Sequence, residues 1–280
     1  MEKVLFSSKL YADNNLSAVD HARSFLENYK DFFHWANSED ILEVGCSNGR
    51  ITKEILYPFV KKHLNCLIGA DICPEAIQIA NETNNLMNLS FETMDITDLD
   101  GCYKYKERFN HIFALYLFHV VERSDLWSTN VFQMLKPNGQ LFFSVIANED
   151  NFANKCLSAQ QSDNTKPWYK YIKDLRLYFV DYGPTPKETI TNILEGAGFI
   201  IDKIDLYHDA LFHYPNTDVM RSTFLSTNPF YSHIPDELKA PYFEDYVNKL
   251  LDYVTYENGM YTIKFDVLTV LATKYDSKHI

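Results

Sequence analysis

Short apolar segments alternate with amphipathic stretches between Asp40 and Ile146, and this alternation constrains the fold more than any other feature of the chain. The apolar runs predict strands and the amphipathic stretches predict helices, so the pattern indicates βαβ units in a parallel sheet. The predicted strands are Ile41–Val44, Cys66–Ala70, Ser90–Met94, His111–Leu115 and Gln140–Val145. The predicted helices are Arg50–Lys62, Pro74–Asn85 and Asp125–Leu135, with a turn over Lys136–Gly139 before the fifth strand.

The rhythm changes after Ile146. Two irregular segments rich in aromatic residues, 148–184 and about 208–258, interrupt the second half of the chain. Between them we expect the helix Thr185–Ala197, ended by Gly198, and the strand Phe199–Tyr207, and after them a terminal strand Met260–Thr273. The sequence thus divides into an N-terminal helical cap (1–39), a core (40–147), a first insertion (148–184) and a C-terminal part (185–280) that holds the second insertion.

Composition excludes several classes of function. The net charge of the 280-residue chain is −12, and no run of Lys and Arg supplies the basic stripe that phosphate neutralisation needs, so nucleic acid is not an expected partner. No stretch reaches the roughly 18 apolar residues of a membrane span, and no membrane contact is expected. The five cysteines show neither CxxC pairs nor metal-ligand spacing, so we expect a cytoplasmic protein without a metal site.

The strongest local signal is the segment Ile41–Arg50, in which an apolar strand runs into a glycine-bearing turn and a helix. Gly45 and Gly49 allow close approach of a ligand to the backbone, and Ser47 stands between them. A dinucleotide site would have three glycines around a pyrophosphate. Here Glu43 at the strand end suits a cationic ligand better, although an ordinary strand–turn–helix remains the alternative.

Two further acidic residues, Asp71 and Asp95, follow the second and third predicted strands. A carboxylate after the second strand can accept from ribose hydroxyls, and one after the third can accept from an adenine amino group. Each alone is more often a helix cap or a solvated loop residue. Because the ends of parallel strands meet at one edge of a sheet, we expect Glu43, Asp71 and Asp95 to form one site.

This pattern resembles that of class I S-adenosylmethionine methyltransferases over roughly Ile41–Val145. The resemblance implies an α/β fold with a seven-stranded, doubly wound, Rossmann-like sheet whose last strand is antiparallel. It also implies S-adenosylmethionine as cofactor and S-adenosylhomocysteine as product. The cofactor-binding residues that it implies are Tyr11, Glu43, Gly45, Cys46, Ser47, Gly49, Asp71, Ile72, Asp95, Ile96 and Leu115. Of these, Glu43 and the Gly45–Gly49 turn would surround the methionine part, Asp71 the ribose, and Asp95 with Ile96 the adenine.

A longer resemblance, to insect juvenile hormone acid methyltransferases, spans nearly the whole chain. Its markers are Leu10-Tyr11, Asn14-Asn15, Phe109–Ile112, Leu117–Val121, Leu135–Gly139, Trp168, Tyr171, Gly198-Phe199, Asn228–Phe230 and Ile234-Pro235. It implies methylation of the carboxylate of a sesquiterpenoid acid, juvenile hormone acid or farnesoic acid, held under a cap made by the two insertions. The partner would be a small hydrophobic carboxylic acid, and the candidate substrate-binding residues are Leu16, Tyr116, His119, Val120, Trp168 and Tyr171.

The chain departs from these relatives at two positions. Leu16 stands where they usually carry a glutamine that hydrogen-bonds the acceptor carboxylate, and Val120 where they usually carry a tryptophan that donates to it. The departures leave open another small acid or hydroxyl acceptor, or a non-catalytic paralogue that binds a ligand.

No catalytic base is assigned, because a carboxylate is already ionised at neutral pH. His119 is the one weak candidate, and a structural histidine is the alternative. Trp168 and Tyr171 are as compatible with packing as with substrate contact. The amphipathic stretch Pro241–Tyr256 favours a helix packed on the protein, with a homodimer face as the alternative.

Overall fold

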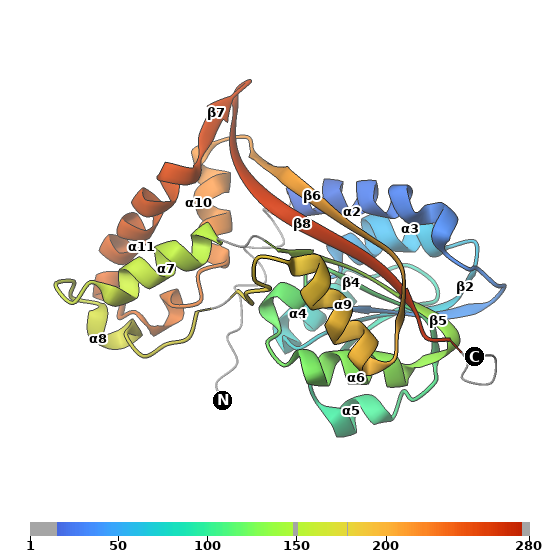
Figure 1. Ribbon diagram of the computed structural model, residues 1–280. Coiled ribbons are helices and arrows are strands. Elements are labelled where there is room, and N and C mark those ends of the chain that lie inside the picture. Colours follow the sequence, from blue (N-terminus) through green and yellow to red (C-terminus); the bar gives the residue numbers. More distant parts are fainter. Residues whose placement is uncertain (1–15, 148–150, 178, 276–280) are drawn as a thin grey trace.

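The computed structural model describes residues 16–147, 151–177 and 179–275, and it centres on one eight-stranded sheet in the order β3-β2-β1-β4-β5-β8-β6, with β7 paired to β8 (Figure 1). The strands are β1 (Glu39–Val44), β2 (Leu64–Asp71), β3 (Leu89–Thr93), β4 (Phe109–Leu115), β5 (Leu135–Ile146), β6 (Ile200–Tyr214), β7 (Thr255–Glu257) and β8 (Met260–Thr273). β1 to β5 run parallel, and β8 lies antiparallel between β5 and β6. The expected seven-stranded sheet with an antiparallel last strand is confirmed, and β7 is a short addition to it.

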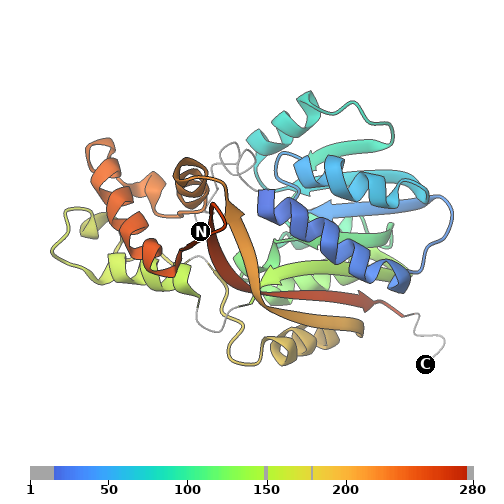
Figure 2. The ribbon, with the colours of Figure 1, turned by 90° about the horizontal axis from the view of Figure 1, so that it is seen from above.

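Helices cover both faces of the sheet (Figures 1 and 2). On one face lie α2 (Leu16–Tyr29), the helical stretch Thr52–Val60 and α4 (Pro74–Glu82), whose side chains share a core with Phe113 and Phe142. On the other face lie α5 (Leu99–Tyr103), α6 (Ser124–Met134) and α9 (Pro186–Ala197), which pack on Phe109 and Phe143. Burial on both faces is why the central strands are nearly continuous apolar runs.

Two local predictions need correction. The expected α-helix Arg50–Lys62 is a π-helix over Thr52–Leu56 followed by α3 (Tyr57–Val60). Pro58 cannot donate a backbone hydrogen bond, and the widened turn comes just before it. The turn expected over Lys136–Gly139 lies inside β5, where the pairing steps from Phe109↔Leu135 to His111↔Gln140. The extra β5 residues bulge, and Asn138 takes a left-handed φ of 63°.

The region expected to be irregular from His208 to Asn258 is also ordered into elements. β6 continues past the predicted end at Tyr207 to Tyr214, because β8 pairs with it along that whole length. The chain then forms α10 (Thr217–Ser226), the 3₁₀ turn η4 (Tyr231–His233), α11 (Asp236–Leu250), the 3₁₀ turn η5 (Leu251–Tyr253) and β7. The helix predicted over Pro241–Tyr256 therefore begins five residues earlier and ends at Leu250.

The two insertions fold together into one helical lobe (Figures 1 and 2). α7 (Phe152–Ser162) and α8 (Tyr169–Ile172) from the first insertion share a core with α10 and α11 from the second. β5 ends at Ile146 opposite Val267, whereas β8 and β6 remain paired as far as Tyr214↔Tyr261. These two long strands therefore reach past the carboxyl ends of the parallel strands and carry the lobe beyond that edge of the sheet.

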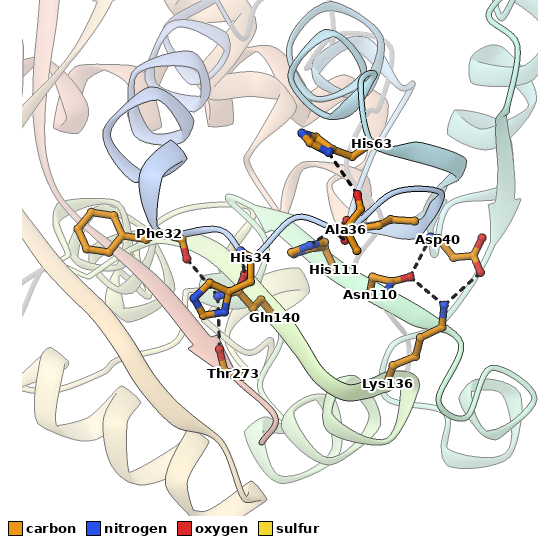
Figure 3. A network of polar contacts seen from close by, with 11 residues as sticks. Phe32, His34, Ala36, Asp40, His63, Asn110, His111, Lys136, Gln140 and Thr273 are labelled. Atoms are coloured by element: carbon orange, nitrogen blue, oxygen red, sulfur yellow. Dashed lines mark hydrogen bonds and ion pairs between the residues drawn. The ribbon is translucent and has the colours of Figure 1, made fainter. Parts of the chain in front are cut away.

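A polar network lies at the opposite, amino edge of the sheet (Figure 3). Oε2 of Glu39 is 3.0 Å from Nε2 of His111, and Oε1 of Glu39 accepts from the Ala36 N–H at 2.6 Å. Nζ of Lys136 reaches Oδ1 of Asn110 at 2.8 Å and Oδ2 of Asp40 at 3.5 Å. The amide of Gln140 contacts His34 N, Phe32 O and Thr273 Oγ1. This edge therefore joins the strands through paired polar groups.

Candidate functional site

The turn after β1 depends on left-handed backbone geometry. Gly45, Ser47 and Gly49 have φ values of 76°, 50° and 75°. A Cβ at Gly45 would lie 2.7 Å from the Leu117 side chain, so glycine is needed there both for φ and for the close approach. The N–H of Gly45 donates to the Ala70 carbonyl at 2.7 Å, which fastens the turn to the end of β2.

Glu43 lies near the end of β1 and is almost completely buried. Among the described residues its Oε2 forms no well-aligned hydrogen bond and no ion pair, and the Thr52 hydroxyl is the polar group that lies beside the carboxylate. Burial raises the pKa of Glu43 to about 7; the Thr52 hydroxyl opposes this rise and the charge of Asp71 adds to it. A buried carboxylate without a cation is costly, and such a group suits a cationic ligand.

Asp71 ends β2 and is held directly against the turn. Its Oδ2 accepts from the Ser47 N–H and its Oδ1 from the Cys73 N–H, both at 2.9 Å. Burial raises the pKa of Asp71, and these backbone hydrogen bonds oppose the rise. The next side chain, Ile72, is apolar and 37% exposed, which leaves an apolar surface beside a carboxylate.

Asp95 follows β3 and completes the row. The N–H of Met94 donates to the Asp71 carbonyl at 2.9 Å, so the end of β3 is fastened to the end of β2. Oδ1 of Asp95 accepts from the Thr97 backbone and hydroxyl, and Ile96 beside it is buried. Because β3, β2 and β1 are neighbours in the sheet, the three strand-end carboxylates lie along one edge, as the sequence predicts. Their binding of a cofactor stays a prediction.

The end of β4 supplies a second group of side chains. Leu115 is buried, Tyr116 has a φ of 58°, and the 3₁₀ turn η3 (Phe118–Val120) follows. The His119 ring is buried and stacks on Phe179 at 5.7 Å between ring centroids. Burial lowers the pKa of His119 to about 3, so this ring is neutral at pH 7 and is no source of positive charge for a carboxylate.

The structure places Trp168 and Tyr171 apart from these two groups. Trp168 is buried in the core of the helical lobe, edge-on to Tyr242 at 5.6 Å, and Tyr171 packs against the same core. Their position favours a packing role, and substrate contact stays a prediction. Leu16 is the first residue of α2, and its side chain lies outside the described part, as does Tyr11.

A cavity of about 960 Å³ opens between α7 and the segment that leads from α8 to α9. Phe179 and Val180 form part of its wall, and the Val180 N–H donates to the His119 carbonyl at 2.7 Å. The remaining lining residues are Glu122, Asn151, Asn154, Lys155, Ser158, Ala159, Ser162, Arg176, Leu177 and Asp181. The cavity therefore adjoins the end of β4 on the side of the lobe.

Sequence reasoning missed two residues beside Tyr116. Nδ1 of His21 on α2 is 2.8 Å from the Tyr116 hydroxyl, and Phe212 on β6 packs edge-on to both rings. Phe212 falls in the segment predicted to be irregular. His21 lies in the predicted N-terminal helix, and the amphipathic pattern of that helix does not distinguish a functional histidine from a structural one.

Comparison with known proteins gives consistent results. A family model described as a methyltransferase domain matches residues 36–198. The chain is 26% identical to the juvenile hormone acid O-methyltransferase of Bombyx mori over 281 aligned residues, with 96% of this chain and 97% of that protein covered. It is 21% identical to the protein of the same name from Drosophila melanogaster, with 86% and 81% covered. The resemblance to this group of enzymes is thereby confirmed.

Solved structures agree in fold. A putative methyltransferase from Bacillus halodurans superimposes with a TM-score of 0.58 at 14% identity, covering 90% of this chain and all of that one. At this identity the likeness shows the fold alone. Among the described residues, no helix is both long and apolar enough to cross a membrane. The family match over residues 36–198, more than half of the chain, shows that the protein belongs to the methyltransferase-domain family.

Proposed function

We propose that the protein transfers a methyl group from S-adenosylmethionine to the carboxylate of a sesquiterpenoid acid, such as juvenile hormone acid or farnesoic acid, and so forms its methyl ester. The observation that carries the cofactor part is Glu43, a buried carboxylate that no cation pairs with among the described residues, at the same sheet edge as Asp71 and Asp95. The acceptor part is supported by similarity along the whole chain to the Bombyx mori protein.

The residues of the carboxyl edge fit this cofactor. The unpartnered Oε2 of Glu43 would accept from the ammonium of the methionine part, beside the Gly45–Gly49 turn. Asp71 would accept from the ribose hydroxyls, with the exposed Ile72 against an apolar face of the nucleoside. Asp95 and Ile96 would border the adenine. Bound there, S-adenosylmethionine supplies an electrophilic methyl group on a sulfonium.

The protein's task with a carboxylic acid is orientation. The acid is ionised at neutral pH and needs no base. The lowered pKa of His119 agrees with this, because a ring with a pKa of about 3 is a weak proton acceptor. Aligning the nucleophile with the methyl group and excluding water accounts for about 7–11 kcal/mol in well-oriented reactions. The aromatic residues between the end of β4 and the long strands β6 and β8 would supply a water-poor site for an isoprenoid tail.

A second candidate keeps the cofactor and changes the acceptor. Leu16 and Val120 have no hydrogen-bonding side chain where the relatives usually have donors, which favours a less polar acid, a fatty acid or a hydroxyl compound. The same departures motivate a non-catalytic protein that only binds such a ligand. Restoring the donors with L16Q and V120W together should switch on methylation if the site is merely disabled.

The direct test incubates the full chain and labelled S-adenosylmethionine with farnesoic acid, juvenile hormone acid, a fatty acid of similar length and the corresponding terpenoid alcohol. We expect labelled ester from a terpenoid acid and none from the alcohol. E43Q is the control, because it changes one buried atom and should lose the product. Ester from the fatty acid or ether from the alcohol alone would select the second candidate. No product from any acceptor, with cofactor binding intact, would favour the ligand-binding protein.

A further inference from the structure

A hydrogen bond joins two side chains from distant parts of the sequence at the end of β4. Nδ1 of His21 on α2 lies 2.8 Å from the hydroxyl oxygen of Tyr116, which directly follows β4. Both side chains are half-buried. The pair therefore places a polar contact at the carboxyl edge of the sheet, where ligands of this fold bind.

Aromatic rings surround this polar pair. Phe212 of β6 stands edge-on to His21 at 4.8 Å and to Tyr116 at 5.8 Å between ring centroids. Phe25 of α2 lies 5.7 Å from His21, and His119 lies edge-on to Tyr116 at 6.2 Å. Hydrogen bonds are stronger in such weakly polar surroundings than in water.

The His21 ring is neutral at pH 7. Burial lowers its pKa, the hydrogen bond with the Leu211 backbone and the charge of Asp20 oppose the decrease, and His213 adds to it. A neutral ring carries one N–H and one lone pair, so it can donate to the phenol oxygen or accept from the phenol hydrogen. It therefore orients the Tyr116 hydroxyl without adding a charge.

The backbone also directs Tyr116 to the cofactor edge. Its φ of 58° is uncommon for a residue with a bulky side chain, and its N–H donates to the Ser144 carbonyl of β5 at 2.9 Å. The next residue, Leu117, lies against Gly45 of the turn after β1. Tyr116 is thus a residue in a strained conformation, held by β5, whose neighbour Leu117 contacts the glycine turn. Such a residue is a functional candidate.

We propose that the Tyr116 hydroxyl, positioned by His21, hydrogen-bonds the oxygen of the methyl acceptor. The proposal rests on the proposed function. Leu16 and Val120, the two positions without a donor, lie on the same helix as His21 and in the segment that follows Tyr116. In the arrangement that serves a carboxylate, the neutral His21 ring carries its one hydrogen on Nδ1 and donates it to the phenol oxygen rather than to the Leu211 carbonyl, and the phenol O–H donates to the acid. His21 is thus a positioning residue and Tyr116 the residue that contacts substrate.

Tyr116→Phe in the full chain tests the contact. It removes one oxygen and keeps the ring, and Tyr207→Phe is the matched control, because Tyr207 packs on Phe25 at 5.1 Å in the same aromatic wall. For the terpenoid acid, Y116F should lower kcat/KM by about tenfold or more, as expected for a lost hydrogen bond to a charged group. The Kd for S-adenosylhomocysteine should change by less than about twofold, because that ligand has no bond to Tyr116 in this proposal. The inhibition constant of the methyl ester should change less than kcat/KM does, because an ester carbonyl accepts a weaker hydrogen bond than a carboxylate.

His21 is tested by rescue. His21→Phe should lower kcat/KM for the acid by several-fold, and His21→Gln, whose amide can still donate to the phenol, should restore part of it. Circular dichroism checks the fold of each variant. If Y116F does not fold, the activities of H21F and H21Q test the proposal instead. Wild-type activity in Y116F, or in H21F where Y116F does not fold, would overturn this proposal and leave the proposed function standing. A wild-type protein that binds S-adenosylhomocysteine but neither binds nor methylates any acid would remove both.

Discussion

Glu39 and Glu43 lie four residues apart on β1 and are 1% and 2% exposed, yet their surroundings differ in whether a possible ion-pair partner is present. Glu39, at the amino edge, accepts from the Ala36 N–H with Oε1, and its Oε2 makes no aligned hydrogen bond but lies 3.0 Å from Nε2 of His111. Glu43, at the carboxyl edge, faces no cationic or histidine side chain among the described residues, and its pKa is raised to about 7. A buried carboxylate without an ion-pair partner is destabilising. In the described part of the chain Glu39 has such a contact and Glu43 has none, which indicates that the carboxyl edge serves a ligand.

The largest expected effect comes from Glu43→Gln. Loss of the carboxylate should weaken the binding of S-adenosylhomocysteine by about 100-fold or more, since a buried charged hydrogen bond is removed. The same change should stabilise the ligand-free protein at alkaline pH. A raised folded-state pKa gives stability that is complete below about pH 4.5 and is lost as pH rises through about 7, by about 3 kcal/mol in all.

Calorimetry with S-adenosylhomocysteine and urea unfolding at pH 5 and pH 9 measure both effects. The stability of E43Q relative to wild type should increase between these two pH values. Unchanged affinity would show that Glu43 is not part of the cofactor site, and equal stability at both pH values would show that the side chain is paired in solution.

The same substitution at the other end of the strand, Glu39→Gln, should act in the opposite sense. It removes the charge facing His111 and should destabilise the protein by about 1–3 kcal/mol, the cost of a buried polar group left poorly satisfied. The affinity of the folded variant for S-adenosylhomocysteine should stay within about twofold, because the amino edge does not contact the ligand. Urea unfolding and calorimetry on the same samples check this. A stable variant with weakened binding would mean that the two edges are coupled.

Both the row of carboxylates and the main sheet were predictable because their signals are local. β1, β2 and β4 are buried on both faces and appear in the sequence as continuous apolar runs, so a carboxylate at the end of such a run is recognisable as a strand-end residue. The terminal strand β8 was predicted with its observed bounds from another local signal, the alternation of its residues and its β-branched content, and its apolar residues lie in the interior of the sheet.

The features that the sequence did not reveal depend on pairing at a distance. The end of β6, residues 208–214, mixes charged and aromatic residues, and it forms a strand only because β8 extends alongside it. The contact of His21 with Tyr116 joins residues 95 positions apart, and no local pattern encodes it. The segment 136–139 in β5 is a similar case. Pro137 and Gly139 indicate a turn, and only the pairing of β5 with β4 shows that the segment is a bulge within a strand.

The pH dependence of binding sharpens the comparison of the edges. Above about pH 7 Glu43 is ionised and can pair with a ligand ammonium, whereas below it the carboxyl must first lose a proton. The Kd of S-adenosylhomocysteine should therefore rise by about tenfold between pH 8 and pH 6. The weak residual binding of E43Q should show no such change. A wild-type Kd that is constant over this range would contradict the raised pKa.

The smallest effect is expected at the amino edge, from Lys136→Met. Lys136 is 36% exposed and lies 3.5 Å from Oδ2 of Asp40 (Figure 3). The Asp40 carboxylate also accepts from Asn65 and Cys66. Burial would raise the pKa of Asp40, but these hydrogen bonds and the Lys136 charge outweigh it and lower the pKa. Stability from a lowered pKa is present above the unfolded value and is lost as pH falls, so K136M should cost less than about 1 kcal/mol at pH 7 and less still at pH 3. Urea unfolding at the two pH values measures this. A loss of unfolding free energy above about 2 kcal/mol at pH 7 would mean that Lys136, Asp40 and Asn110 act as one cooperative network. The charged groups would then stabilise the amino edge as much as the buried Glu39 does.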